Sequence, residues 1–65
     1  MKIKTHILAV NKSSAADAEI SLKLSIDEFI ETNAISAENI ISISHNVSKE
    51  MVTIFRATAL ITYKA

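Results

Sequence analysis

The sequence predicts an α+β domain of β-α-β-β layout: a three-stranded, mainly antiparallel sheet in order 1-3-2, with one helix on one face, in an oligomer. Three observations predict it. β-prone residues fill one stretch at the start of the chain and two at its end, and a helical pattern separates the first stretch from the others. Glycine, proline and cysteine are absent, which favours few connections and excludes disulfides. A chain of 65 residues allows a single domain, residues 1–65, with a small core.

The first strand is predicted over Ile3–Val10, where β-branched and apolar residues stop at a polar cluster. The helix is predicted over Ala15–Thr32. Within it, Ile20–Ile26 alternates apolar and polar residues as a strand would, so a strand is the competing interpretation. The longer window, rich in alanine, glutamate and leucine, favours the helix.

Both ends of the predicted helix carry capping signals. Ser13 or Ser14 offers a side-chain oxygen to the first turn, and Asp17 places negative charge near the positive N-terminal end. Asn33 is the expected left-handed residue beyond the last turn, in place of the usual glycine. A connection is predicted from there to Asn39.

The helical wheel separates two apolar groups. The stripe expected to meet the sheet contains Ala15, Ala18, Leu22, Ile26, Phe29 and Ile30. Ala16, Ile20 and Leu24 fall on nearly the opposite side, which is either an ordinary surface with scattered apolar residues or a contact site. Because the core is small, we expect Ile20 and Leu24 to contact another subunit or a partner helix.

Two further strands are predicted in the second half of the chain. In the first of them, serine and asparagine alternate with Ile41, Ile43, His45 and Val47. A turn is expected at 46–50, followed by the longest β-prone stretch, Met51–Lys64. The first of the two side-chain sets of this last strand, expected to meet the helix, is Met51, Phe55, Ala57, Ala59, Ile61 and Tyr63. The second is Val52, Ile54, Arg56, Thr58, Leu60 and Thr62.

A single helix covers only one face of a thin sheet, so the second set of side chains needs another partner. Val52, Ile54 and Leu60 are too apolar to face water comfortably, and we expect them to lie in a subunit interface. The usual connections between strands place the last strand between the other two. The last strand forms an antiparallel hairpin with the strand before it, whereas the helix forms a crossover connection from the first strand. The two outer strands would then be exposed edges that invite pairing with another copy.

Charge and motif content narrow the function classes. Seven lysine and arginine residues balance seven aspartate and glutamate residues, so we expect neither nucleic acid nor a membrane surface as partner. The apolar run after the N-terminal lysines is too short for a signal peptide, and we predict a cytoplasmic location. No nucleophile–base pair, phosphate loop or metal-ligand spacing is recognisable, so we expect a protein that is not an enzyme and holds no metal.

Arg56 and His45 are the candidate ligand-binding residues. An arginine within an apolar strand needs an anionic partner when buried, either a carboxylate of the same or a neighbouring subunit or an anionic small molecule. His45 alternates in phase with apolar residues, which indicates a histidine at the rim of the core or, alternatively, a ligand-binding group. Phe55 and Tyr63 are interpreted as core aromatics, and His6 as a surface residue.

Three segments carry a resemblance to a known family. Ile40–His45, followed by Phe55–Lys64 with its tyrosine-lysine end, resembles small sporulation-associated proteins of spore-forming bacteria, and Ile26–Ile30 is similar to their acidic-apolar helix end. The resemblance covers most of the chain and brings no catalytic residues with it. The architecture also resembles the dodecins, β-α-β-β proteins that assemble into shells and bind flavins. Dodecin flavin sites stack the ring on tryptophan, which this chain lacks, so no cofactor is expected.

Two hypotheses of function follow. The first is a non-enzymatic, small homo-oligomeric accessory protein that acts through protein contacts. The second is a homo-oligomer that binds or sequesters a small molecule, dodecin-like or phage-encoded, with Arg56 and His45 lining sites between subunits.

Overall fold

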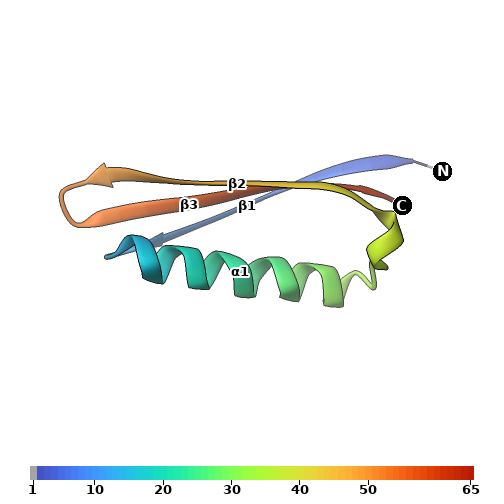
Figure 1. Cartoon of the computed structure of the whole chain (residues 1–65), viewed down its shortest axis with the longest axis horizontal. Coiled ribbons are helices and arrows are strands. Elements are labelled where there is room, and N and C mark those ends of the chain that lie inside the picture. The colour runs from blue at the N-terminus through green and yellow to red at the C-terminus, as the bar shows by residue number, and fades with distance from the viewer. Residues whose placement is uncertain (1) are drawn as a thin grey trace.

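A computed structural model describes residues 2–65 and forms two layers, a sheet and one helix (Figure 1). The elements in chain order are β1 (Ile3–Lys12), α1 (Ala15–Thr32), a short 3₁₀ turn η1 (Ala37–Asn39), β2 (Ile40–Met51) and β3 (Ile54–Lys64). The Cα trace measures 43 × 17 × 13 Å, so the domain is a long, thin slab.

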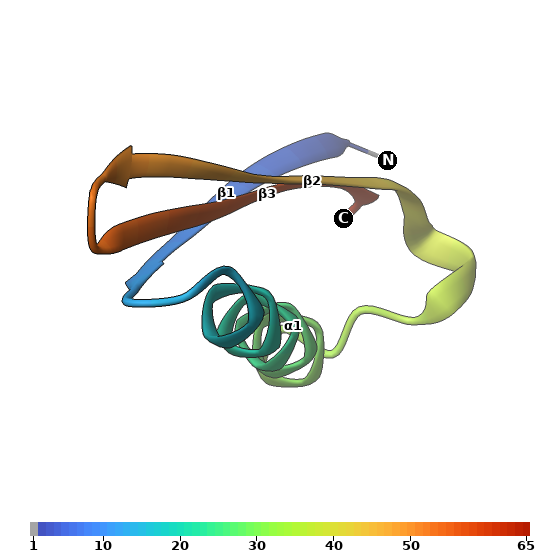
Figure 2. The same cartoon turned by 60° about the vertical axis from the view of Figure 1, so that its left-hand side comes forward.

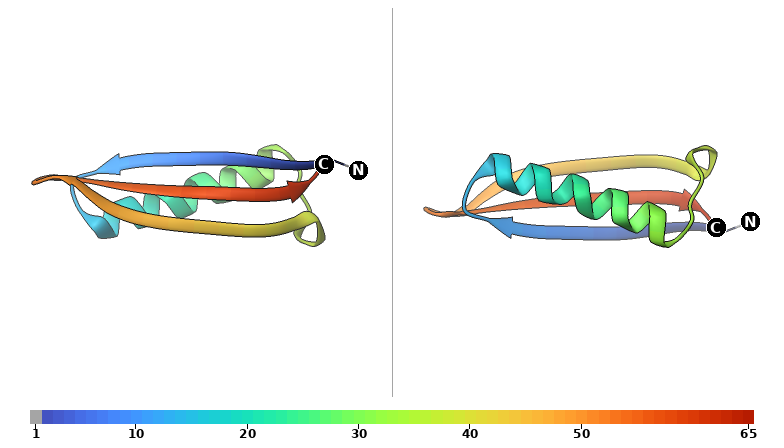
Figure 3. Two further views of the ribbon diagram at one scale, coloured as in Figure 1. Left: turned by 90° about the horizontal axis from the view of Figure 1, so that it is seen from above. Right: turned by 90° about the horizontal axis from the view of Figure 1, so that it is seen from below.

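The sheet has the strand order β1-β3-β2, and both strand pairs are antiparallel. The predicted β-α-β-β layout and the central position of the last strand are confirmed. β3 is therefore the only strand among residues 2–65 with neighbours on both sides, while β1 and β2 form the two edges (Figure 3). Packing of α1 against one face leaves the other face without a covering layer in this chain (Figure 2).

The helix occupies the predicted residues and begins at a side-chain cap. Ser14 has extended backbone angles, and its Oγ accepts a hydrogen bond from the N–H of Asp17 at 3.2 Å. This bond satisfies one of the free N–H groups of the first turn. Of the two serines proposed from the sequence, Ser14 is the cap.

The end of the helix differs from the prediction, because the left-handed residue is Ala34 (φ 51°) and not Asn33 (φ −92°). The Ala34 N–H donates to the carbonyl of Glu31 and the Ile35 N–H donates to that of Ile30, the pattern of a Schellman motif. Asn33 contributes through its side chain, whose Nδ2 donates to the Phe29 carbonyl at 2.9 Å. The Asn33 side chain thus takes part in the cap, although the Asn33 backbone is not left-handed.

The hairpin turn also lies elsewhere than predicted. Val52 and Thr53 form it, so β2 continues through the polar segment 46–50 that was expected to turn. The polar residues of that segment are tolerated in a strand because they lie at an edge and face solvent. Met51 consequently belongs to β2, where it pairs with Ile54 and is 66% exposed, and does not meet the helix.

The strand register assigns side chains to two faces. Opposite residues of antiparallel strands share a face, so the covered face carries Phe55, Ala57, Ala59, Ile61 and Tyr63 of β3 together with their partners in β1 and β2. The open face carries the alternate residues, from Ile54 to Lys64 along β3. A β-bulge at Ile41 separates this residue from the phase of Ile43, His45 and Val47, contrary to the unbroken alternation predicted.

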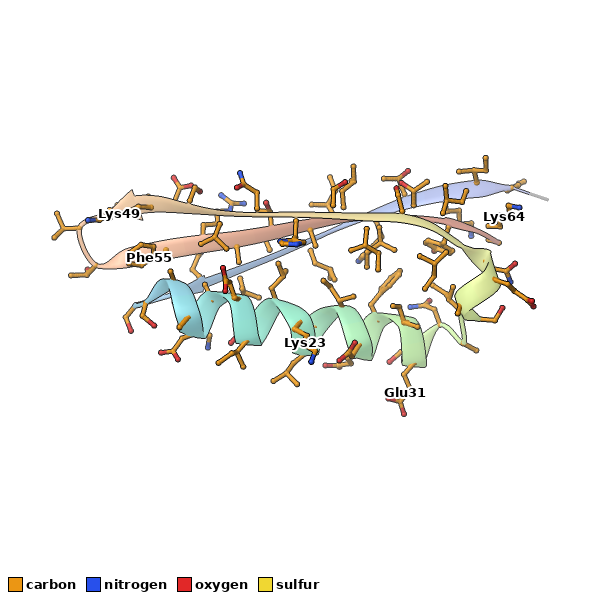
Figure 4. The ribbon with its side chains drawn as sticks, viewed as in Figure 1. Lys23, Glu31, Lys49, Phe55 and Lys64 are labelled. Atoms are coloured by element: carbon orange, nitrogen blue, oxygen red, sulfur yellow. The ribbon has the colours of Figure 1, made fainter. Side chains whose placement is uncertain are left out.

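The core between the layers is small and consists of small residues. Its buried apolar members are Ala18, Leu22, Ala57, Ala59 and Ile61. Half-buried neighbours complete it, among them Leu8, Val10, Ile26, Val47 and Phe55. The ammonium group of Lys49 lies 5.9 Å from the centroid of the Phe55 ring and closes the core at the turn end (Figure 4). Alanines on both layers allow the helix to approach the sheet closely, but they contribute little apolar area.

Candidate functional site

The open face of the sheet is a surface that the fold leaves without a covering layer (Figure 2). Figure 3 (left) shows the three strands side by side on this face, with α1 behind them. Ile7 of β1 pairs with Leu60 of β3, and these side chains are 70% and 40% exposed. Ile3, at the start of β1, is 67% exposed on the same face. Large apolar side chains thus lie on the open face, outside the core.

Short polar side chains surround this apolar group. Threonines from β1 and β3 lie in register with serines and asparagine from β2: the face includes Thr5, Thr58, Thr62, Ser42, Ser44 and Asn46. Such residues carry little charge and pack readily against another β-sheet. The middle of the open face is therefore an uncharged, mixed apolar and hydroxyl-bearing surface.

Charged groups stand at the two ends of the open face. Arg56 pairs in register with Asn11 and Ser48 near the hairpin turn. The Glu50 carboxylate is held at the same end, since its Oε1 accepts a hydrogen bond from Ser48 Oγ at 2.9 Å. Lys64, the last residue of β3, lies at the opposite end of the sheet (Figure 4).

The two predicted ligand-binding residues do not form one site within the chain. Arg56 lies on the open face, is exposed, and so does not need the buried anionic partner that the sequence suggested. His45 pairs with Ala59 and lies on the covered face. Side chains on opposite faces of a sheet point away from each other. A ligand that contacts both would have to lie between subunits.

Other predicted interface residues divide among three places. Leu60 and Ile54 lie on the open face, as predicted, and Leu60 is exposed. Val52 is 85% exposed but lies in the hairpin turn, so its assignment to a strand face is wrong. Ile20 and Leu24 are 59% and 62% exposed on the outer side of α1, away from the core, as predicted.

His45 lines a cleft between α1 and β2. The cleft measures about 300 Å³ and is also lined by Glu19, Leu22, Lys23 and Ile26 of the helix. The helix crosses the sheet diagonally, from near β2 at its start toward β1 at its end, which opens this space (Figure 3, right). Leucine and isoleucine form its apolar wall, while the carboxylate, the ammonium and the imidazole provide polar groups of both signs.

A second cleft, of about 320 Å³, lies on the β1 side of the helix. Phe29 lines it and stacks on His6, with ring centroids 4.1 Å apart. The rings of Phe29 and Tyr63 form a T-shaped pair with centroids 5.7 Å apart. His6 is exposed, as predicted, but its stacking was missed. The signal was present, because His6 is in phase with Leu8 and Val10 on the covered face.

Within residues 2–65 no three or more histidine, aspartate or glutamate side chains gather as a metal site would require. No polar or charged side chain of the same residues is buried. Across this described part of the chain, no helix has both the length and the apolar character needed to cross a bilayer.

Comparison with protein-family models, with curated proteins and with solved structures finds no match to this chain. The resemblances to sporulation-associated proteins and to dodecins are therefore neither supported nor contradicted by known proteins.

Proposed function

We propose that the chain is a non-enzymatic, homo-oligomeric accessory protein that acts through protein contacts, and that copies associate by stacking their open sheet faces. The observation that carries the proposal is the distribution of apolar side chains. Three of the five buried core residues are alanines, whereas Ile3, Ile7 and Leu60 are exposed on the open face.

The core alone leaves the domain short of stability. Burying a leucine or isoleucine side chain contributes about 1.5–3 kcal/mol, and an alanine much less. Among the larger apolar residues of the described segment 2–65, only Leu22 and Ile61 are buried. A core below about 70 residues rarely supplies more than ~3–5 kcal/mol, and small domains commonly add oligomerisation. Association through the open face would bury the apolar surface that the helix does not reach.

The open face has the dimensions of a modest interface. Three strands about 4.8 Å apart and ten residues long at about 3.4 Å per residue give a flat footprint of roughly 14 × 34 Å. Two such faces bury on the order of 1,000 Å² between them, which reaches the lower limit for a specific interface. Ile7 and Leu60 lie in the middle of this footprint, Ile3 lies at one end beside Lys64, and Arg56 and Glu50 lie at the other end. An apolar centre with a charged rim is the usual anatomy of an interface.

A pair of leucine substitutions tests the proposal. Leu60→Asp places a carboxylate in the stacked face, where it would be desolvated without a partner, so we expect at least a tenfold rise in the dissociation constant. Leu24→Asp, on the outer side of α1, tests the helix contact expected from the sequence, and stacking of the open faces predicts that it leaves the dissociation constant unchanged. Sedimentation equilibrium over a range of concentrations measures both.

Each result has a definite meaning because both leucines are exposed and neither supports the core. Dissociation by Leu24→Asp with no effect of Leu60→Asp would move the interface to the helix and overturn the stacking. A wild-type chain that stays monomeric and folded would overturn the oligomer itself.

A second function is supported by the His45 cleft. Its volume of about 300 Å³ falls at the lower end of small-molecule sites, and it combines an apolar wall with three polar groups. In this alternative the oligomer retains a small molecule, and Arg56 of a neighbouring subunit binds an anionic group of it through a contact other than the stacked open faces, since Arg56 lies on the open face and the cleft on the covered face. Native mass spectrometry of the purified oligomer would then show a retained mass that Arg56→Ala removes without dissociating the subunits. A wild-type oligomer without extra mass speaks against it.

A further inference from the structure

The two edges of the sheet differ in how well they are protected. β1 carries Lys4 and Lys12 near its ends, and the second half of α1 lies over it (Figure 3, right). β2 has no lysine, arginine, aspartate or glutamate from Ile40 to Ser48. In edge strands that remain unpaired, charged residues, lysine above all, usually prevent pairing with another chain. β2 lacks this protection over most of its length.

The unprotected edge is also regular. β2 pairs with β3 without interruption from Ser42 to Lys49, and the register shifts lie just outside this segment. All residues from Ser42 to Lys49 except Val47 are exposed. The free side of the segment therefore offers a straight row of backbone donors and acceptors to a further strand.

The sequence of this segment is nearly symmetric about His45. Reading outward from the histidine, Ser44 matches Asn46, Ile43 matches Val47, and Ser42 matches Ser48, the two serines being identical. Antiparallel pairing of the segment with itself, centred on His45, places apolar residues opposite apolar residues and small polar residues opposite small polar residues. Cross-strand pairs of matched character stabilise a sheet, and a hydrophobic pattern of this kind fixes its register.

We propose that β2 pairs antiparallel with β2 of a second copy, about a two-fold axis at His45, to form a continuous six-stranded sheet. The symmetry of the segment identifies the occupant of this edge as another copy of the chain. Both helices then lie on the same face, and the two His45 clefts meet across the axis. The cleft, open at the edge of one chain, is completed by residues of the other.

This edge pairing involves backbone groups and is independent of the proposed stacking of open faces. Each of the two contacts is two-fold, with the same surface on both partners. A chain that uses both forms more than a dimer, and the smallest closed assembly is a tetramer of two stacked six-stranded sheets.

Single cysteines test the edge pairing, since the chain has no cysteine of its own. Directly opposed residues of antiparallel strands have Cα atoms about 4.5–5.5 Å apart, within the range of a disulfide. His45→Cys should therefore oxidise to a covalent dimer. Ile43→Cys is the matched control on the same strand and face: two such residues lie four positions apart along paired strands, about 13 Å, beyond disulfide reach. We expect at least tenfold more covalent dimer for His45→Cys.

A third variant separates this proposal from the stacking of open faces. Thr58→Cys, in the central strand, cannot react across the β2 edge, but two copies can be joined across stacked faces by a linker that spans about 10 Å. Linking of Thr58→Cys without a disulfide in His45→Cys would overturn the edge pairing and leave the stacking intact. Equal disulfide yields from His45→Cys and Ile43→Cys would overturn the register and the proposal with it. Circular dichroism of the three variants confirms that each is folded.

Discussion

The two faces of β3 are built from the same strand and serve opposite purposes. On the covered face, Ala57, Ala59 and Ile61 are 0%, 3% and 0% exposed beneath the helix. On the open face, the intervening Leu60 is 40% exposed, beside Ile7 at 70%. Two alanines on the covered face permit close approach of the helix, while a leucine stays exposed on the open face. The comparison teaches that the apolar residues of this strand are divided between the core and an exposed face, where Ile54 and Leu60 remain available for the association proposed above.

The largest expected effect distinguishes these two faces directly. Ile61→Ala removes the only large, fully buried side chain among residues 2–65 and leaves a cavity, at a cost of about 2–5 kcal/mol in the free energy of unfolding. That is comparable to the whole stability expected of so small a core, so we expect an unfolded chain at low concentration. Urea denaturation followed by circular dichroism measures it.

Leu60→Ala, one residue away, is the control for Ile61→Ala. Its effect on unfolding should depend on protein concentration, because the proposed stacking places this side chain between copies. A loss of stability that is equal for both variants and independent of concentration would contradict the division of the strand into two roles.

Ala18→Leu tests the close approach of the helix. Ala18 is 0% exposed and packs with Ala57 and Ala59, so a larger side chain must push the layers apart, at about 1–3 kcal/mol. Thermal unfolding should show the loss. Ala16→Leu, an exposed position of the same helix, should change stability by no more than about 0.5 kcal/mol. If Ala18→Leu is as harmless as its control, the covered face is not closely packed.

The smallest effect concerns the end of the covering helix. Ala34 adopts the left-handed conformation (φ 51°), which costs an ordinary residue about 1–2 kcal/mol, and glycine avoids this cost. Glycine also has more freedom in the unfolded chain, so Ala34→Gly should raise the free energy of unfolding by a net ~0.5–1 kcal/mol. Ala37→Gly, at an exposed position without positive φ, should lower it instead. Stabilisation by both variants, measured by urea denaturation, would contradict this explanation.

Much of the fold followed from local patterns in the sequence. Helix α1 has the predicted bounds because its apolar period, its serine cap and the polar segments on either side all agree. The strand order followed from the short connection between β2 and β3 and the crossover through α1. The open face was recognised from Leu60 and Ile54, which alternate with the residues that pack on the helix.

The features that sequence reasoning missed depend on tertiary context. The turn at Val52 and Thr53 consists of residues that prefer strands, and without glycine or asparagine nothing local marked it. The left-handed position fell to Ala34 because the amide of Asn33 bonds to the Phe29 carbonyl. The bulge at Ile41 changed which residues of β2 share a face, and no residue type in the sequence predicts a bulge at this position. Arg56 and His45 lie on opposite faces of the sheet because of the strand register, which could not be predicted from the sequence.

The central position of β3 also determines when the molecule can fold. Among the described residues β1 and β2 pair only with β3, which follows both of them in the chain. Until β3 has left the ribosome, neither earlier strand has its sheet partner, and the apolar stripe of α1 has no complete surface to cover. A nascent chain that stops at Met51 therefore lacks every strand pair of the native sheet. The sheet can form only once β3 is available, so β1 must wait unpaired while the helix and β2 are made.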